Sequence, residues 1–365
     1  MKILLLGEYS NVHNTLAEGL RVLGHEVTVA SNGDYWKNYP RDIDLARRPG
    51  KLGGLTLMAK VYRLLPTWHN YDVVQLINPM FLDLKAERLF PIYRYLKKHN
   101  KKIVLGAMGI DWFWVHEGTY RKPLRYSDFN IGNSDRTDET AKKEQDDWLD
   151  TPKGRLNRLI ADECDGIAAV LYENYVYYKP YHAEKTRFIP LPIKSIGDIS
   201  PKDTIGPIKV FIGISKGRSA YKGTDIMLKA AEDVKEKYPD RIELLKAEGL
   251  PFEDYQRMMD GSDIIMDQLY SYTPAMNGLL AMSKGIICMG GGEPESYELL
   301  GEQELRPVIN VEPTYESVFH ELEQLVLHPE SILQLKRQSI AYVRKHHDSL
   351  EVARQYAEFY QSLFH

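Results

Sequence analysis

The sequence has little cysteine and no long apolar run. Two of its 365 residues are cysteine, and Cys164 and Cys288 lie far apart in apolar surroundings. Their separation does not match a metal site or a redox pair, so we expect two reduced core thiols. No segment approaches the roughly 18 apolar residues of a membrane-spanning helix. The apolar run over residues 1–7 is too short for a signal peptide and is typical of a first strand.

The chain also lacks an excess of either charge. Its 47 Lys and Arg against 51 Asp and Glu leave a net charge of −4, which gives no support for general nucleic-acid binding. A composition of 43% hydrophobic and 27% charged residues is typical of a soluble globular protein, and 365 residues suit two domains. We therefore expect a cytoplasmic protein, with the inner face of the membrane as an alternative location.

Strands and helices alternate in the same way in two halves of the chain. In each half a strand runs into a glycine-containing turn, then an amphipathic helix, then a second strand. The two copies lie at residues 2–30 and 208–245. This alternation predicts parallel sheets that bind ligands at the carboxyl ends of their strands. The fold class we expect is α/β, with two Rossmann-like parallel-sheet domains facing across a cleft.

A proline-rich connector over residues 190–207 is the best domain boundary. We expect a first domain at 1–195, a second at 196–345, and a C-terminal helix at 346–365 that crosses back to the first. Two stretches look less regular, namely residues 35–69 and a charged insertion at 121–150.

The most informative stretch runs from residue 262 to residue 300. A strand ending at Asp267 is followed by Thr273 and Pro274, which suit the N-cap and first turn of a helix over 275–282. Gly285 suits the left-handed end of that helix. The next strand runs into three glycines, Gly290, Gly291 and Gly292. Backbone without side chains ahead of a helix lets a phosphate approach N–H groups, which predicts a nucleotide-diphosphate cradle.

The order and spacing of several motifs resemble the GT-B glycosyltransferases, especially the retaining family 4 type, over nearly the whole chain. The motifs are Tyr-Lys-Gly-Thr-Asp at 221–225, Ser-Asp-Ile at 262–264, residues 280–285, Gly-Gly-Glu-Pro-Glu at 291–295, residues 102–111, and residues 165–170 leading to 189–190. The resemblance implies a hexosyltransferase-type enzyme of polysaccharide biosynthesis. It would use a nucleotide-sugar donor, retain the anomeric configuration and need no metal or other cofactor. The acceptor would be a glycan or a lipid-linked saccharide.

The resemblance also implies a cationic pair on the loop after the first strand of the second domain. Here that loop begins at Gly213, and the pair matches Arg218 and Lys222, with Lys216 as a further cation. They would stabilise the charge of the leaving diphosphate. A solvated basic loop is the alternative.

The chain departs from the resemblance at the family's pair of glutamates. The second position is Leu280, and the first falls near Ser271 or Tyr272. Asn277 could reach the nucleotide instead, or Asp267 or Gln268 could replace the sugar contact. Alternatively, the chain is a non-catalytic nucleotide-sugar or glycan-binding protein of the GT-B fold.

Two further acidic residues have a functional and a structural interpretation. Glu295 would meet the donor or stabilise a helix start. Asp111 would act on an acceptor hydroxyl or cap the next helix.

The acceptor side is expected at the first domain. Gly7, Tyr9 and His13 would contact the acceptor, and Trp112 would stack on a sugar. For His13 a structural role, and for Trp112 core packing, are the alternatives. The turn after Gly7 lacks the G-x-G-x-x-G pattern of a dinucleotide site.

Basic residues recur at 47–63 and at 94–102, next to aromatic residues. Such patches could contact anionic lipid heads at a membrane or simply form a solvated helix face.

Overall fold

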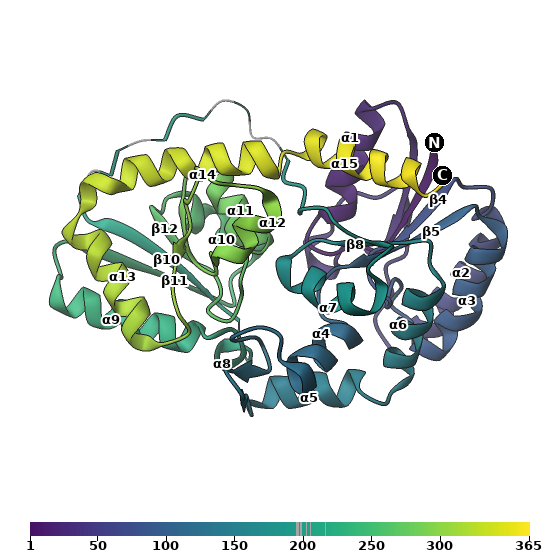
Figure 1. The fold of residues 1–365 in the computed structure, drawn as a ribbon, viewed down its shortest axis with the longest axis horizontal. Helices are drawn as coiled ribbons and strands as arrows, with labels where there is room; N and C mark the ends of the chain where they lie inside the picture. The colour runs from purple at the N-terminus through teal and green to yellow at the C-terminus, as the bar shows by residue number, and fades with distance from the viewer. Residues whose placement is uncertain (195–196, 198, 202, 205, 216) are drawn as a thin grey trace. The chain divides into compact units, whose positions relative to one another are not determined.

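The structure, a computed structural model, describes the chain except for residues 195, 196, 198, 202, 205 and 216, and describes Phe252 by its backbone alone. Lys216, predicted to bind the donor, therefore lies outside the described residues. The chain divides into two compact units (Figure 1). The first comprises residues 1–117, 144–194 and 349–365, and the second comprises residues 118–143 and 195–348.

The first unit is built on a parallel sheet of strand order β3-β2-β1-β4-β5-β8-β9. Its strands are short and almost wholly apolar, as expected for a sheet covered on both faces. The strands are β1 (Lys2–Leu6), β2 (Glu26–Ser31), β3 (Ile43–Asp44), β4 (Val73–Leu76), β5 (Lys102–Ala107), β8 (Gly166–Ala169) and β9 (Thr186–Phe188). The helices are α1 (Val12–Val22), η1 (Tyr35–Lys37), α2 (Gly53–Leu64), η2 (Leu65–Thr67), α3 (Ala86–His99), α4 (Trp112–His116), α6 (Pro152–Glu163), α7 (Tyr172–His182) and α15 (Ser349–Ser362).

The C-terminal helix α15 packs against α1 in the first unit (Figure 1). Gly19 of α1 permits the contact, because a Cβ there would lie 2.6 Å from the Cβ of Ala353. Tyr360 of α15 donates a hydrogen bond of 2.7 Å to Gln75 of β4, and the amide nitrogen of Gln75 lies 3.1 Å from Nε2 of His13. Nδ1 of His13 lies 2.9 Å from the carbonyl oxygen of Gly7. These buried bonds connect β1, α1, β4 and α15.

The second unit has its own parallel sheet, of strand order β11-β10-β12-β13-β14. Its core is formed by buried aliphatic residues of β10, β12 and β13 with one face of α9 and of α13. The strands are β10 (Ile208–Ile214), β11 (Ile242–Glu248), β12 (Ile264–Met266), β13 (Ile287–Gly290) and β14 (Ile309–Asn310). The helices are α8 (Ser219–Lys222), α9 (Thr224–Lys237), α10 (Phe252–Asp260), α11 (Met276–Ser283), α12 (Pro294–Leu300), α13 (Tyr315–Leu327), η4 (Pro329–Ser331) and α14 (Ile332–His346).

Residues 118–143, which we call the inserted segment, group with the second unit although their flanks belong to the first. The sequence predicted them within the first domain and as irregular. They instead contain most of η3 (Glu117–Arg121), the antiparallel pair β6 (Asn130–Ile131) and β7 (Ser134–Asp135), and the start of α5 (Glu139–Trp148). Their contacts with the second unit are long-range in sequence, which explains why local patterns did not reveal them.

The helix predicted over 275–282 begins at Met276, so Thr273 is not its N-cap. Ala275 occupies that position, and its N–H donates to the carboxylate of Asp267 at 3.2 Å. The expected left-handed glycine at Gly285 is confirmed, with φ of 78°. Among the described residues, no helix is long and apolar enough to cross a membrane.

Burial of His13 predicts a measurable dependence of stability on pH. Burial lowers the pKa of this imidazole to about 3, whereas the unfolded chain titrates near 6.5. The unfolded chain therefore binds a proton that the native state does not bind, and the free energy of unfolding falls as the pH falls below 6.5. Between pH 7 and about pH 5 the contribution of His13 should decrease by about 2 kcal/mol.

The measurement is urea unfolding of the wild type and of His13→Gln, followed by tryptophan fluorescence. The chain's five tryptophans lie in the residues of the first unit, so the signal reports on that unit. The difference in unfolding free energy between wild type and variant should narrow by about 2 kcal/mol at the lower pH. His69→Gln, which replaces an exposed histidine of the same unit, is the control. An equal difference at both pH values would contradict the prediction.

Candidate functional site

Three loops of the second unit leave the same edge of its sheet. Because β10, β12 and β13 are parallel, their carboxyl ends lie side by side. The loop after β10 contains Arg218 and Lys222, the loop after β12 begins with Asp267, and the loop after β13 contains the three glycines. The predicted donor-binding residues of this unit that are described therefore come from neighbouring segments.

The loop after β10 contains cations and leads into α9. Its last turn is the short helix α8, and Gly223, with φ of 73°, connects α8 to α9. A Cβ at Gly223 would lie 2.5 Å from the Cβ of Leu269, so the loop is held close to the strand end of β12. The loop begins after Ile214, so Gly213, predicted at its start, lies within β10. It packs there under Tyr255, whose ring a Cβ would meet at 2.8 Å.

Arg218 has the most unusual environment in this loop. Its guanidinium lies 5.1 Å from the ring centre of Tyr221, and its Nε is buried. That nitrogen has no hydrogen-bond partner among the residues that the structure describes. A buried donor without an acceptor is costly, so a positively charged one favours an anionic ligand at this position.

Asp267 is the buried acid of the site. Burial raises the pKa of its carboxyl, and the nearby positive charge of Lys222 acts in the opposite direction. The carboxylate accepts the N–H of Ala275 at the start of α11, and a Cβ at Gly278 would lie 2.8 Å from it. Asp267 therefore connects the cationic loop to α11, while Asn277 is exposed in the first turn of that helix.

The three glycines are required by the protein's own packing. A Cβ at Gly290 would lie 2.8 Å from the carbonyl oxygen of Gln268, and one at Gly292 would lie 2.8 Å from Val308. At Gly291 the carbonyl oxygen of Ser271 would be only 1.8 Å away. The N–H of Gly292 also donates to Asn310 at 2.9 Å, so this amide already has an acceptor within the protein. Side-chain positive charge at this edge of the sheet is provided by the loop after β10, which contains Arg218 and Lys222.

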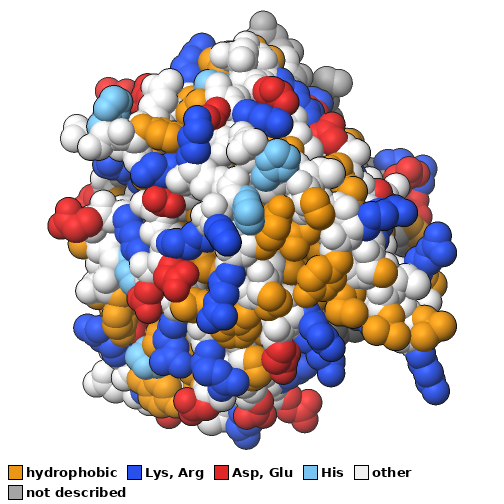
Figure 2. Space-filling model, turned by 90° about the vertical axis from the view of Figure 1, so that its right-hand side faces the viewer, with side chains coloured by type: hydrophobic (Ala, Val, Ile, Leu, Met, Phe, Trp, Pro, Cys, Tyr) orange, Lys and Arg blue, Asp and Glu red, His pale blue; other side chains and the backbone are white. Residues whose placement is uncertain are grey.

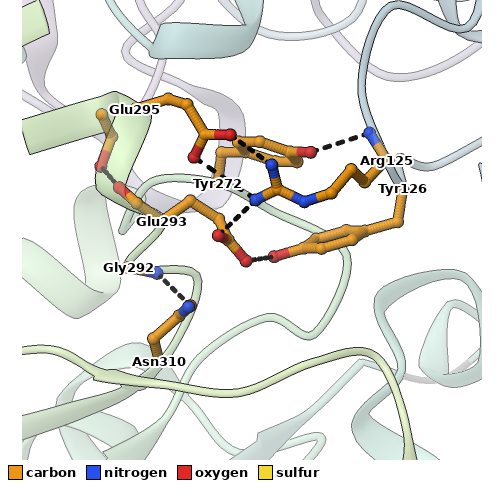
Figure 3. A network of polar contacts seen from close by, with 8 residues as sticks. Arg125, Tyr126, Tyr272, Gly292, Glu293, Glu295 and Asn310 are labelled. Carbon is orange, nitrogen blue, oxygen red and sulfur yellow. Dashed lines mark hydrogen bonds and ion pairs between the residues drawn. The ribbon is translucent and has the colours of Figure 1, made fainter. Parts of the chain in front are cut away.

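An ion-pair network joins the inserted segment to the start of α12 (Figure 3). The guanidinium of Arg125 binds Glu293 at 2.5 Å and also contacts Glu295. Glu293 is buried and accepts a 2.5 Å hydrogen bond from the hydroxyl of Tyr126. The N–H of Arg125 donates to the hydroxyl of Tyr272 at 2.8 Å. The hydrogen bond from Arg125 holds the pKa of Glu295 below its usual value.

Arg136 attaches the inserted segment to the cationic loop itself. Its guanidinium lies 3.5 Å from the ring centre of Tyr270 and donates to the carbonyl oxygens of Ala220 and Tyr221, at 2.8 and 3.0 Å. These carbonyls belong to the last turn of α8, where positive charge is stabilising. Thr140 adds a hydrogen bond of 3.1 Å to the carbonyl oxygen of Gly217. The inserted segment therefore fixes the backbone on which Arg218 and Lys222 are placed.

In the first unit Asp111 caps a helix. One carboxylate oxygen accepts the N–H of Trp114 at 2.9 Å, and the other accepts the hydroxyl of Tyr178 at 2.5 Å. Asp111 is fully buried, and burial raises the pKa of its carboxyl to about 6. Trp112 is packed as well, because its ring stacks on His116 at 4.3 Å and lies 4.8 Å from the guanidinium of Arg158. These contacts are those of the structural alternatives given above.

The acceptor candidates near β1 have structural contacts too. His13 is fully buried, with both ring nitrogens within hydrogen-bond distance of partners. A Cβ at Gly7 would lie 2.3 Å from Ile77. Burial raises the pKa of Tyr9. Glu8, to which the sequence assigned no role, accepts the N–H groups of His13 and Asn14, and burial raises its pKa to about 7.

Sequence reasoning missed the residues that bring the inserted segment to the site. Arg125, Arg136 and Glu293 have partners that lie more than eighty residues away in sequence. Aromatic and basic residues do gather at 120–126, but this local composition does not identify a partner.

Comparison with known proteins identifies the fold. No protein-family model matches the sequence, and no curated protein is similar to it. Solved structures do match along the whole chain. HepE from Anabaena, determined with UDP and glucose, is 15% identical with a TM-score of 0.59, covering 99% of this chain and 100% of that one.

Two further structures extend the likeness. Sucrose-phosphate synthase from Thermosynechococcus elongatus is 12% identical with a TM-score of 0.63, covering 100% of this chain and 99% of that one. UDP-GlcNAc 2-epimerase from Neisseria meningitidis, bound to UDP-GlcNAc, is 11% identical with a TM-score of 0.54, covering 98% and 99%. The predicted fold class, two parallel-sheet α/β domains of the GT-B kind, is confirmed. At these identities the likeness concerns the fold alone.

The position of Arg136 predicts that it controls the order of the inserted segment. Its side chain is 8% exposed, and removing it deprives carbonyl oxygens of a charged donor. Since such bonds contribute about 1.5–3 kcal/mol each, Arg136→Ala should increase tryptic cleavage within residues 118–143 at least about tenfold. The cleavage rate of Arg136→Lys should lie between those of Arg136→Ala and the wild type, because an ammonium group cannot reproduce the planar, forked hydrogen bonding of a guanidinium.

Cleavage is measured by mass spectrometry during limited digestion of the native protein. Arg241→Ala, which removes an exposed arginine elsewhere in the second unit, is the matched control. Equal cleavage rates in Arg136→Ala and the wild type would show that the segment is held by other contacts.

Proposed function

We propose that this protein transfers a sugar from a nucleotide-diphosphate donor to a hydroxyl of a glycan or lipid-linked saccharide. The second unit would hold the donor and the first unit the acceptor. The observation that carries the proposal is Arg218, a guanidinium with a buried, unpartnered Nε at the carboxyl edge of the sheet, within the described residues. An anionic diphosphate is the ligand that this group fits.

The charge distribution around the loop after β10 supports a diphosphate. Two guanidinium groups lie close to the ring of Tyr221. That of Arg136 is 5.8 Å from the ring centre, and that of Arg218 is 5.1 Å from it. Asp138 offsets the charge of Arg136 through an ion pair of 3.2 Å, whereas no carboxylate partner of Arg218 is found in the described part of the chain. Lys222 adds a further charge beside buried Asp267. The N-terminus of α9 follows directly and favours negative charge as well.

The same arrangement suggests how the reaction is assisted. As the glycosidic bond breaks, negative charge grows on the diphosphate, and Arg218 and Lys222 would stabilise it more strongly than in the ground state. The sugar would pass through an oxocarbenium-like state before an acceptor hydroxyl attacks. Asp267, held by Ala275 beside Lys222, would orient that lysine. Asp111 receives no step in this proposal, because one of its oxygens caps α4 and the other accepts the hydroxyl of Tyr178.

Several finer points belong to the proposal as well. Retention of configuration, independence of metal, transfer of a hexose and a role in polysaccharide assembly are the expectations that follow from the family resemblance. Solved structures of the same fold were determined with UDP, with UDP and glucose, and with UDP-GlcNAc, which makes uridine nucleotides the first donors to test.

The first test is thermal stability with UDP, GDP, ADP and their sugar conjugates. A ligand that binds only the native state raises the free energy of unfolding, and with it the melting temperature. At a ligand concentration a hundred times the dissociation constant, the gain in unfolding free energy is about 2.7 kcal/mol. We expect a rise of a few degrees with one nucleotide series, followed by transfer to a saccharide acceptor detected by mass spectrometry. The same incubation, examined by NMR, distinguishes transfer from hydrolysis and from epimerisation of the sugar.

The second test is Lys222→Ala. Loss of one cation that stabilises the transition state should lower the rate of donor turnover about a hundredfold to a thousandfold. Lys235→Ala, which removes an exposed lysine of α9, should retain wild-type turnover. Near-normal activity of Lys222→Ala would place the diphosphate elsewhere. Donor binding without transfer or hydrolysis across a broad acceptor panel would favour the non-catalytic alternative.

A further inference from the structure

One stretch of the first unit is free of acidic residues. Residues 45–71 contain no Asp or Glu, although the chain has 51 of them. The stretch includes five basic residues, Arg47, Arg48, Lys51, Lys60 and Arg63. It forms the exposed segment that leads into α2, then α2 and η2. Its net positive charge is therefore concentrated on one surface element of a chain that is acidic overall.

Helix α2 has an apolar row on each of two opposite sides. Gly53, Leu57 and Val61 are buried, and their spacing of four residues places them on the side that packs on the unit. At helical spacing, Leu52, Leu55 and Tyr62 lie on the opposite side, with exposures of 68, 57 and 44%. A helix that only covers a sheet needs one apolar side, so the outward apolar row is not explained by the core of the unit.

Basic side chains border this outward row. Lys51 lies in the turn that precedes α2 and Arg63 lies in the last turn of the helix, and both are exposed. No ion pair of Arg48, Lys51 or Arg63 occurs among the residues that are described. Figure 2 faces the side of the first unit where α2 and α3 lie, and hydrophobic side chains gather there among those of Lys and Arg. We call Leu52, Leu55, Tyr62, Lys51 and Arg63 the α2 surface.

The second basic group of this unit has a different character. Lys101 and Lys102 form ion pairs with Asp72 and Asp165, at 2.7 and 3.4 Å. No large apolar side chain of α3, which is fully described, is exposed. That group therefore has the features of a solvated helix face, and it provides an internal comparison for the α2 surface.

We infer that the α2 surface docks on a membrane that contains anionic lipid. The exposed leucines and the tyrosine would enter the boundary between headgroups and acyl chains, while Lys51, Arg63 and Arg48 contact anionic headgroups. An apolar row flanked by cations that form no ion pair among the described residues is complementary to such a surface. This inference does not depend on the proposed transferase activity, and its test needs no substrate.

The test is cosedimentation of the full-length protein with two kinds of vesicle. One is phosphatidylcholine alone and the other is phosphatidylcholine with an equal part of phosphatidylglycerol. We expect binding to the anionic vesicles only, weakened by added salt. Lys51→Glu/Arg63→Glu should lower the partition constant at least about tenfold, because each basic residue near an anionic surface contributes about a factor of five. Leu52→Ser/Leu55→Ser should lower it roughly tenfold as well.

The matched control is Arg94→Glu/Lys98→Glu, the same change of charge at exposed positions of α3. It should bind nearly as well as the wild type. Circular dichroism of all variants confirms folding, since every substituted side chain is exposed. Three results would overturn the inference. The first is that the wild type does not bind anionic vesicles. The second is that the α3 control loses as much vesicle binding as Lys51→Glu/Arg63→Glu. The third is that the wild type is a dimer that binds no vesicles and that Leu52→Ser/Leu55→Ser converts to a monomer.

Discussion

The contact of Arg136 with the end of α8 is the interaction on which the candidate site depends. The loop after β10 buries the ring of Tyr221, but the carbonyl oxygens at the end of α8 need donors from outside the loop. Arg136 supplies what is missing, because its planar guanidinium stacks on Tyr270 and satisfies the carbonyl oxygens of Ala220 and Tyr221. The site is thus assembled from two parts of the chain that are distant in sequence.

The electrostatics of the second unit follow from this assembly. Each arginine of the inserted segment in this region is matched by acid, Arg136 by Asp138 and Arg125 by Glu293 and Glu295. Arg218 and Lys222 lie on the segment that Arg136 holds in place, and the positive charge of Lys222 acts on the carboxyl of Asp267. The paired arginines thus act as structural anchors, while the loop that Arg136 holds has a positive charge suited to an anion.

Much of the architecture could be predicted from sequence, because it depends on local patterns. Short apolar strands alternating with amphipathic helices are sufficient to indicate two parallel sheets, and Gly285 was recognisable from its position after a helix. The phosphate role of the glycines at 290–292 stays a prediction. What the structure adds is a packing reason for glycine, because backbone and side chains of Gln268, Ser271 and Val308 occupy the space that a Cβ would need.

The remaining features could not be predicted, because they depend on contacts between distant residues. Nothing near Asp267 in the sequence indicates that its carboxylate accepts the N–H of Ala275. Nor does the sequence indicate that Ala275, and not Thr273, is the N-cap of α11. His13 resembled a ligand contact at a helix start, yet its partner Gln75 lies 62 residues further along the chain. Gln75 in turn accepts a hydrogen bond from Tyr360, which lies 285 residues beyond Gln75. The assignment of the inserted segment to the second unit is of the same kind.

The order in which the chain visits the two units has a consequence for how the protein can be divided. It passes from one to the other after Glu117, Lys143, Lys194 and Asp348. A fragment ending at Lys194 would lose α15, which leaves the contact face of α1 and the buried amide of Gln75 uncovered. The complementary fragment would lack Arg125 and Arg136, so Glu293 would lose its cation and the carbonyl oxygens of Ala220 and Tyr221 would lose their donor. Neither half is a self-sufficient gene product, and an exchange of domains with a related protein would have to transplant the inserted segment and the final helix along with the sheets that they complete.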